Sequence, residues 1–320
     1  MKPPTSISKK NSTDPIASIV ITDVTLRDGL QAEAKFIPWR EKIELWHRLR
    51  PLPYHRWEVA SSINPKWVPQ FNENEEFCRE LYSSPVALPE TMAFVPNLKG
   101  CERLIAYPIP WVSSFIAASE TFNKKNVNAS IDDTLLELAK IARLTRAEGR
   151  KLRVYVSTVF GCPYEGEITL EKLMGLLKGL VDLNPDEIAL SDTIGVAVPP
   201  QMRAILYAFQ SLYPVQKTAL HLHNTYDLAL ANSQAGYDAG VRIFDGSTGG
   251  IGGCPYAKGA TGNVASEDLF YLFQRQTGSR PVSPPHLKSC LEYLKDNLGL
   301  NLHSAINAII DKGGTPYASQ

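Results

Sequence analysis

The sequence lacks several features that would assign it to common classes of protein. No apolar run approaches the roughly 18 residues that a transmembrane helix needs. The opening stretch MKPPTSISKKNSTDP contains no apolar core of a signal peptide. Lys and Arg total 33, as do Asp and Glu, so no charge excess points to nucleic acid or to an acidic membrane surface. The sequence alone therefore favours a globular protein of the cytoplasm and leaves the mitochondrial matrix open.

Cysteines are few, and no two of them lie close together in the sequence. The five cysteines are Cys78, Cys101, Cys162, Cys254 and Cys290. An odd number of widely separated cysteines argues for free thiols in a reducing compartment. The absence of a closely spaced pair argues against a structural zinc site.

The chain contains instead a regular alternation of short β-rich runs and helical patterns, and no Gly/Ser-rich linker interrupts it. The predicted strands are 18–24, 56–61, 91–95, 111–119, 152–160, 186–192, 217–223 and 241–247. Amphipathic stretches follow at 40–50, 132–149, 169–183, 199–213 and 229–240. This rhythm predicts an α/β fold, a (β/α)₈ TIM barrel.

The predicted barrel spans residues 17–278, after a flexible lead-in of residues 1–16 and before a helical C-terminal extension of residues 279–320. The alternative is an open doubly wound sheet. The sequence disfavours the open sheet, because no G-x-G-x-x-G turn follows the first strand.

Polar side chains gather where the predicted strands end. In strand order these residues are Arg27, Asp28, Gln31, Glu58, Ser61, Asp192, His221, His223, Cys254 and Asn263. The active site of a barrel lies at the carboxyl ends of its strands. Burying such groups is costly unless they pair or bind something, so we expect them to form one functional site.

Two histidines, His221 and His223, stand one residue apart in the seventh strand. Residues i and i+2 of a strand point to the same face, so both can share one ligand. Asp28 comes from a neighbouring strand of a closed barrel, and Asn263 can add an oxygen ligand. Mixed nitrogen and oxygen ligands suit one catalytic divalent ion such as Mg²⁺ or Mn²⁺, with zinc left open.

A glycine-rich loop follows the eighth strand, with five glycines between Gly246 and Gly253. So many glycines disfavour a helix or a packed strand. One interpretation is a long floppy turn. We favour a mobile flap that carries Cys254 over the site, because exposed thiols are usually avoided without a use.

The chain resembles the 3-hydroxy-3-methylglutaryl-CoA lyase family, which belongs to the metal-dependent barrel lyases related to isopropylmalate and homocitrate synthases. The resemblance spans roughly residues 18–275 and is carried by the motifs RDGLQ, PKWVPQ, PNLKG, AASETFNKKNVNASI, GCPYEGEI, DTIGV, HLHNTY, ALAN and GGCPYAKGATGN. It implies a carbon–carbon lyase that cleaves a 3-hydroxy-3-methylacyl-CoA by retro-Claisen chemistry. For the usual substrate the products are acetyl-CoA and acetoacetate.

The resemblance also implies roles for individual residues. The metal ligands would be Asp28, His221, His223 and Asn263; the catalytic residues Arg27, Asp28, His221, Cys254 and Glu58; and the substrate-binding residues Arg27, Gln31, Ser61 and Asp192. The expected partners are a small-molecule acyl-CoA substrate and further copies of the chain, as a homodimer or higher homo-oligomer. No nucleic acid or membrane partner is expected.

Some positions depart from the lyase pattern. Thr25 and Leu26 precede Arg27 where the lyases read GP, and Asn224 and Asp227 replace the acid and the glycine of their HDTYG motif. These departures leave three alternatives open: a lyase for a related thioester such as citramalyl-CoA, a Claisen-condensing acyltransferase, and a non-catalytic metal-binding barrel.

Overall fold

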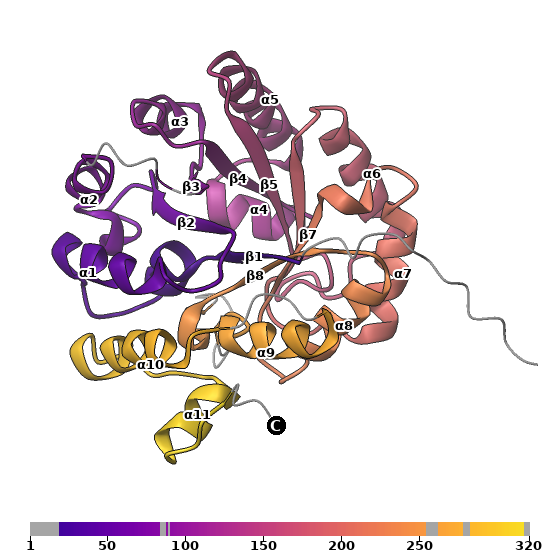
Figure 1. Ribbon diagram of the computed structural model, residues 1–320. Coiled ribbons are helices and arrows are strands. Elements are labelled where there is room, and N and C mark those ends of the chain that lie inside the picture. Colours follow the sequence, from indigo (N-terminus) through magenta and orange to yellow (C-terminus); the bar gives the residue numbers. More distant parts are fainter. Residues whose placement is uncertain (1–18, 84–87, 89, 254–261, 278–281, 317–320) are drawn as a thin grey trace, which may run out of the picture.

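Eight parallel strands form a closed barrel in the order β1 to β8 in this computed structural model (Figure 1). The structure describes residues 19–83, 88, 90–253, 262–277 and 282–316. The strands are Val20–Asp23, Arg56–Ser61, Thr91–Phe94, Trp111–Ala117, Lys151–Ser157, Glu187–Asp192, Thr218–Leu222 and Ile243–Gly246. β1 pairs with both β2 and β8, which closes the sheet. The predicted TIM barrel is therefore confirmed, and the open sheet is wrong.

Helices form the outer layer of the barrel (Figure 1). They are α1 (Trp39–Leu49), α2 (Asn74–Leu81), α3 (Leu98–Ile105), α5 (Ile131–Ala147), α6 (Leu170–Val181), α7 (Pro199–Phe209), α8 (Ala229–Asp238) and α9 (Ser266–Thr277). The short helix α4 (Glu120–Val127), which follows β4, is drawn inside this ring in Figure 1. Two further helices, α10 (Pro284–Glu292) and α11 (Ala305–Asp311), follow the barrel. In the part of the chain that the structure describes, no helix combines the length and the apolar character that crossing a membrane requires.

Alternating side chains along the strands separate two apolar regions. Leu220 and Leu222 belong to the large cluster between the strands and the helices. Ala219 instead joins a small cluster inside the barrel with Tyr155 and Ile243. Because residues two apart share a face, His221 points inward with Ala219. Leu220 and Leu222, on the opposite face of β7, pack outward against the helices.

Arginine ion pairs fill the amino-terminal half of the barrel interior. Arg153 lies 3.0 Å from Glu187 and 2.7 Å from Asp245, and Arg56 lies 3.0 Å from Glu187. The Arg56 guanidinium also stacks 3.8 Å from the centre of the Trp111 ring. Buried charges are tolerated only when they are paired, so this network packs the interior and leaves the carboxyl end for a site.

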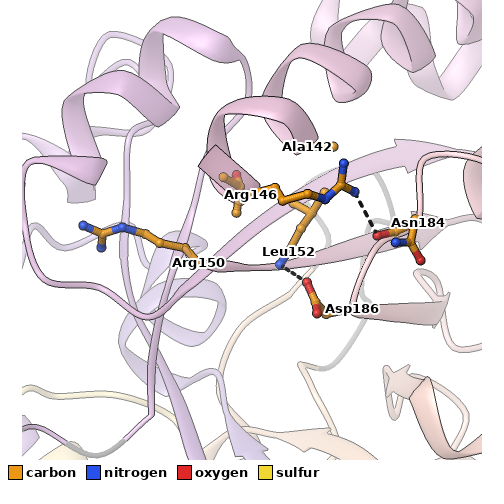
Figure 2. Close-up of a pocket in the computed structure, with 7 residues that line it drawn as sticks. Ala142, Arg146, Arg150, Leu152, Asn184 and Asp186 are labelled. Atoms are coloured by element: carbon orange, nitrogen blue, oxygen red, sulfur yellow. Dashed lines mark hydrogen bonds between the residues drawn. The ribbon is translucent and has the colours of Figure 1, made fainter. Parts of the chain in front are cut away.

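A pocket lies at the opposite, amino-terminal rim of the barrel, at the starts of β5 and β6 (Figure 2). Arg146 donates to the backbone oxygen of Asn184, and Asp186 accepts from the backbone nitrogen of Leu152 at 2.9 Å. These bonds connect the end of α5 and the start of β5 to the loop before β6. The pocket is therefore part of the rim packing and lies away from the polar strand ends.

Asp23 at the end of β1 is a buried carboxylate outside the barrel interior. One of its oxygens accepts from Thr25, and the other has no hydrogen-bond partner among the described residues. Burial raises the pKa of Asp23 to about 7, although the bonds from Thr25 lower it. The folded protein therefore takes up a proton at this carboxyl at a pH where the unfolded chain does not.

Asp23→Asn should stabilise the protein at pH 8 and have little effect near pH 4. The wild-type carboxyl has a raised folded-state pKa, so stability falls as pH rises from about 4 to about 7. An asparagine keeps the acceptor oxygen and removes that loss. Urea unfolding midpoints at pH 5 and pH 8 measure the effect, with the exposed Asp132→Asn as control. If the unfolding midpoint of Asp23→Asn changed between pH 5 and pH 8 by as much as that of the wild type, the raised pKa would not belong to Asp23.

Candidate metal centre at the carboxyl end of the barrel

A tight π-helical turn, Thr25–Gly29, positions the first predicted ligand. The hydroxyl of Thr25 accepts from the backbone of Thr248, which ties the turn to the loop after β8. A Cβ at Gly29 would lie 2.9 Å from the side chain of Ile251, so this position requires glycine. The turn directs Arg27 and Asp28 toward the barrel axis. Single π-helical turns often occur at functional sites.

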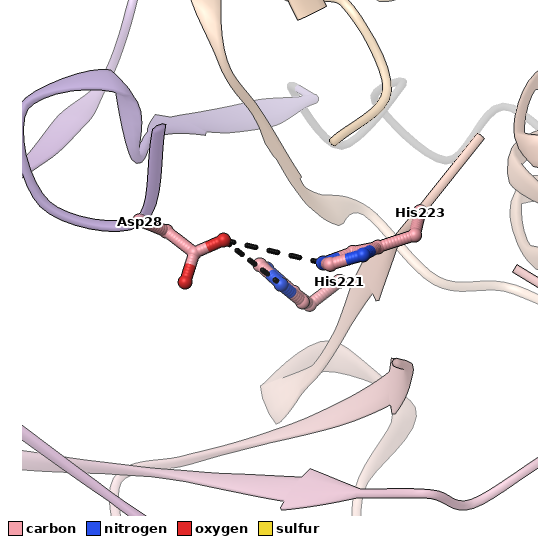
Figure 3. A group of neighbouring side chains, drawn as sticks. All are labelled: Asp28, His221 and His223. Atoms are coloured by element: carbon pink, nitrogen blue, oxygen red, sulfur yellow. Dashed lines mark ion pairs between the residues drawn. The ribbon is translucent and has the colours of Figure 1, made fainter. Parts of the chain in front are cut away.

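Asp28, His221 and His223 converge at this end of the barrel (Figure 3). Asp28 Oδ2 lies 3.8 Å from His221 Nε2 and 4.0 Å from His223 Nε2. Such ligands lie about 2.0–2.2 Å from a divalent ion, so two ligands of one ion can be at most about 4.4 Å apart. Both distances to Asp28 fall within that limit. The candidate ligand atoms of all three residues lie within 4.8 Å of one another, so small side-chain shifts would bring them around one divalent cation.

Burial and neighbouring charges favour the deprotonated forms of Asp28 and His223, which are the forms that bind a cation. Burial alone would raise the pKa of Asp28, but the Arg27 guanidinium and the two histidines hold it well below its usual range. Burial, with His221 beside it, lowers the pKa of His223 to about 4. Metal ligands must be deprotonated. At neutral pH the site thus presents a carboxylate and an unprotonated His223.

Asn263 lies beside these residues because its backbone forms an isolated antiparallel bridge with His223. Its amide nitrogen donates to Asp28 Oδ2 at 2.9 Å and to the backbone oxygen of Ile251 at 3.3 Å. The amide oxygen is the atom that could coordinate a cation. Asn263 is therefore close enough to be a fourth ligand, but its amide must rotate to become one.

Arg27 is buried beside the three residues and is held on two sides. It bonds Asp28 Oδ1 at 2.5 Å, and its Nε donates to Glu58. Its guanidinium carbon also lies 4.9 Å from the centre of the Phe94 ring and 5.6 Å from that of Tyr155. Glu58 and Asp28 keep the pKa of Arg27 above its ordinary value despite burial, which lowers it. A fixed, permanently charged donor therefore borders the site.

Of the other predicted substrate-binding residues, Asp192 and Ser61 accept hydrogen bonds from nearby backbone nitrogens, and Gln31 has an oxygen without a partner in the described residues. Asp192 accepts from the backbone nitrogens of Val196 and Ala197 at 3.0 and 2.9 Å, and burial raises its pKa to about 6. The Ser61 hydroxyl accepts from the backbone nitrogen of Ile63. Gln31 Oε1 is buried without a partner within the described ranges. Substrate binding by these three residues stays a prediction.

Cys254 lies outside the described residues, but the loop that leads to it is described up to Gly253. Gly249, Gly250 and Gly252 have φ values of 75°, 62° and 100°, which favour glycine. Glu267 accepts from the nitrogen of Gly249, whose oxygen accepts from His303 at 2.7 Å. The base of the loop is thus hydrogen-bonded to α9 and to the segment before α11. The flap stays a prediction.

Several residues of this end of the barrel escaped the sequence prediction. Tyr155 and Ser191 are buried, and their hydroxyls have no hydrogen-bond partner in the described part of the chain. Ser191 is paired in register with His221 and so faces inward. Ser113 donates to Glu58 at 2.5 Å, and Asp245 lies 3.1 Å from His221. The alternation of each strand is the sequence signal that indicates these inward-facing residues, which the polar strand ends alone do not include.

The chain is similar to a set of known enzymes. The family model described as HMGL-like matches residues 18–292. The mitochondrial hydroxymethylglutaryl-CoA lyase of Bos taurus is 42% identical over 255 residues, which cover 79% of this chain and 78% of that protein.

Solved structures are similar along almost the whole chain. The crystal structure of a Bacillus subtilis HMG-CoA lyase has a TM-score of 0.86 and 33% identity, covering 92% of this chain and 98% of that one. An Acinetobacter baumannii HMG-CoA lyase in complex with coenzyme A and 3-methylmalate has a TM-score of 0.84 and 29% identity, covering 95% and 97%. The matches therefore extend over both the barrel and its polar end.

Proposed function

The chain belongs to the HMGL-like family, and on that premise we propose that it is a carbon–carbon lyase that cleaves 3-hydroxy-3-methylglutaryl-CoA to acetyl-CoA and acetoacetate. The observation that carries the proposal is the convergence of Asp28, His221 and His223 beside the buried Arg27. The same combination suits retro-Claisen cleavage, in which a 3-hydroxyl group loses its proton and the bond between C2 and C3 breaks. Negative charge then develops on the thioester oxygen.

Asp28, His221 and His223 would hold one Mg²⁺ or Mn²⁺ ion per chain, with Asn263 as a fourth ligand after its amide rotates. A bound divalent cation supplies Lewis acidity, which lowers the pKa of an alcohol and stabilises charge on oxygen. Carboxylate, amide and imidazole ligands suit these ions, and soft thiolate ligands would favour others. The donor set therefore supports magnesium or manganese.

Arg27 would stabilise the negative charge that develops on the thioester oxygen. Its guanidinium is held by Glu58 and Asp28, so little reorganisation is needed when the charge appears. Glu58 in turn accepts from Ser113. We therefore assign Arg27 a catalytic role and Glu58 the role of positioning it.

The hydroxyls of Tyr155 and Ser191 would donate to polar atoms of the substrate. Both are buried, and Ser191 shares the inward face of the barrel with His221. A buried hydroxyl without a partner is costly, and a bound carboxylate or hydroxyl would remove that cost. The proton donor to the product enolate would be Cys254 or His221, and the initial base would be Asp28 or His221.

The rival functions make different demands on the site. A lyase for citramalyl-CoA would use the same polar residues with a different acyl pocket. A Claisen-condensing acyltransferase would run the carbon–carbon step in the opposite direction. A non-catalytic metal-binding barrel would not need Arg27 held beside the metal ligands. An acyl-CoA ligand, a cytoplasmic location and a homodimer or higher oligomer belong to this proposal as well.

The test is to incubate purified protein with Mg²⁺ and a panel of 3-hydroxy-3-methylacyl-CoA thioesters, and to identify the products by mass spectrometry. We expect acetyl-CoA and acetoacetate from 3-hydroxy-3-methylglutaryl-CoA, and no cleavage by Asp28→Ala. Cleavage of citramalyl-CoA alone would support the rival lyase. A folded, metal-loaded protein that cleaves none of the thioesters would contradict the proposal.

Cys254→Ala should retain the fold and the metal content but lose most turnover, because the proposed flap would no longer carry a thiol to the enolate. Alkylating reagents should modify Cys254 first, since Cys78, Cys101, Cys162 and Cys290 are all buried. Bound substrate should slow that modification. Peptide mapping after limited alkylation is the measurement. Full modification of Cys254 with activity retained would refute the flap role.

A further inference from the structure

The two histidines of the candidate metal centre have different surroundings. His221 Nδ1 lies 3.1 Å from Asp245 Oδ2, while its Nε2 faces Asp28 at 3.8 Å. The Tyr155 ring packs edge-on against His221 with 5.4 Å between ring centres. His223 Nδ1 is buried and has no hydrogen-bond partner in the described ranges. Of the two histidines, only His221 therefore has a hydrogen-bond partner at Nδ1 among the described residues.

Asp245 is itself held in place. It comes from β8, has a side chain with no exposed surface, and receives two hydrogen bonds from one nitrogen of Arg153, at 2.7 and 2.8 Å. Arg153 extends from β5 on the other side of the barrel and also lies 3.0 Å from Glu187. A carboxylate bound to a guanidinium is an acceptor only. The proton of the bond between Asp245 and His221 therefore belongs to His221 Nδ1.

We propose that Asp245, held by Arg153, is a positioning residue that fixes His221 as the tautomer protonated at Nδ1, so that the Nε2 lone pair points at the cation position. A neutral imidazole has one donor and one acceptor nitrogen, and the partner of one nitrogen decides which is which. The inference rests on the metal site of the proposed function. It adds a pair of residues from β5 and β8 to that site.

This arrangement also narrows the proton chemistry. With Nδ1 donating to Asp245 and Nε2 directed at the cation, His221 has no free nitrogen to take up or deliver a proton. His223 lacks such a partner, so its tautomer is not fixed in the same way.

The experiment uses full-length protein labelled with ¹⁵N-histidine and free of metal. Nitrogen chemical shifts and proton couplings report which ring nitrogen carries the proton, and the spectrum of His221→Gln assigns the His221 signals. We expect the Nδ1-protonated tautomer in the wild type. In Asp245→Asn the amide nitrogen can donate to Nδ1, and we expect the proton to move to Nε2.

Calorimetric titration with Mn²⁺ gives the second measurement. Changing a group that supports a ligand typically costs about 10–100-fold in metal affinity, and we expect a loss of that size in Asp245→Asn. Glu187→Gln is the matched control, because it removes a carboxylate from the same Arg153 network without touching His221. We expect Glu187→Gln to retain the wild-type tautomer of His221 and to keep a Mn²⁺ affinity within about threefold of wild type.

Two results would overturn the proposal: an Nε2-protonated His221 in the wild type, or an equal loss of Mn²⁺ affinity in the two variants. If Asp245→Asn fails to fold, the wild-type tautomer still decides. A wild type with the expected tautomer and Mn²⁺ binding but no lyase activity would refute the proposed function and leave this inference standing.

Discussion

Replacing Arg27 by lysine should lower kcat by about 10²- to 10³-fold, the usual cost of losing one donor to a developing oxyanion. A lysine keeps the positive charge, but its donors all sit on one nitrogen and cannot reproduce the planar guanidinium fork that spans Glu58, Asp28 and the site. Metal content should change little, because no atom of Arg27 is a candidate ligand. Steady-state kinetics on the metal-loaded variant measures the effect.

The matched control is Arg56→Lys. Arg56 is as buried as Arg27, at 5% exposure each, and is also paired with a glutamate, but it lies toward the amino-terminal end of the barrel. It should lose stability without a comparable loss of kcat. If Arg27→Lys behaves the same way, with near-normal kcat and a lower unfolding midpoint, Arg27 serves the fold rather than the reaction.

The sequence predicted the barrel because the physical signals of its strands are local. Each strand is a short buried run, and β2 was predicted with its observed bounds, Arg56–Ser61. The helix α4 was not predicted, because its sequence ETFNKKNV has little apolar periodicity. It is held by the Ser119 cap and by the buried Asn123, which bonds the backbone of Ala129 and Ser130. Bonds made by single polar side chains leave no apolar periodicity in the sequence, even when they are local.

The candidate site was predictable to the extent that it depends on strand ends. Barrel closure brings Asp28 to the two histidines, as expected from the neighbouring positions of β1, β7 and β8. The pairing of Asp245 with Arg153 was not predictable, because it spans the interior between β5 and β8. The local role of Asp192 escaped prediction too, since a polar residue after a strand can either face a ligand or cap the following turn.

His223→Ala should weaken divalent-ion binding by more than about 100-fold, because changing a group that only supports a ligand already costs about 10–100-fold. His223 is buried, and its low pKa of about 4, caused first by burial, leaves it unprotonated at neutral pH and able to bind a cation. Alanine leaves Asp28 and His221 as the remaining members of the cluster. Activity should fall with occupancy and recover in part at high Mn²⁺ concentration.

Elemental analysis after identical metal loading and dialysis is the measurement for His223→Ala. The control is His47→Ala, which removes an exposed histidine of α1 and should retain wild-type metal content. Circular dichroism must show that both variants are folded, since deleting a buried imidazole leaves a cavity. A folded His223→Ala protein with undiminished metal content would mean that the cation binds elsewhere. Asp28 and His221 alone could not hold the ion as tightly as the three residues together.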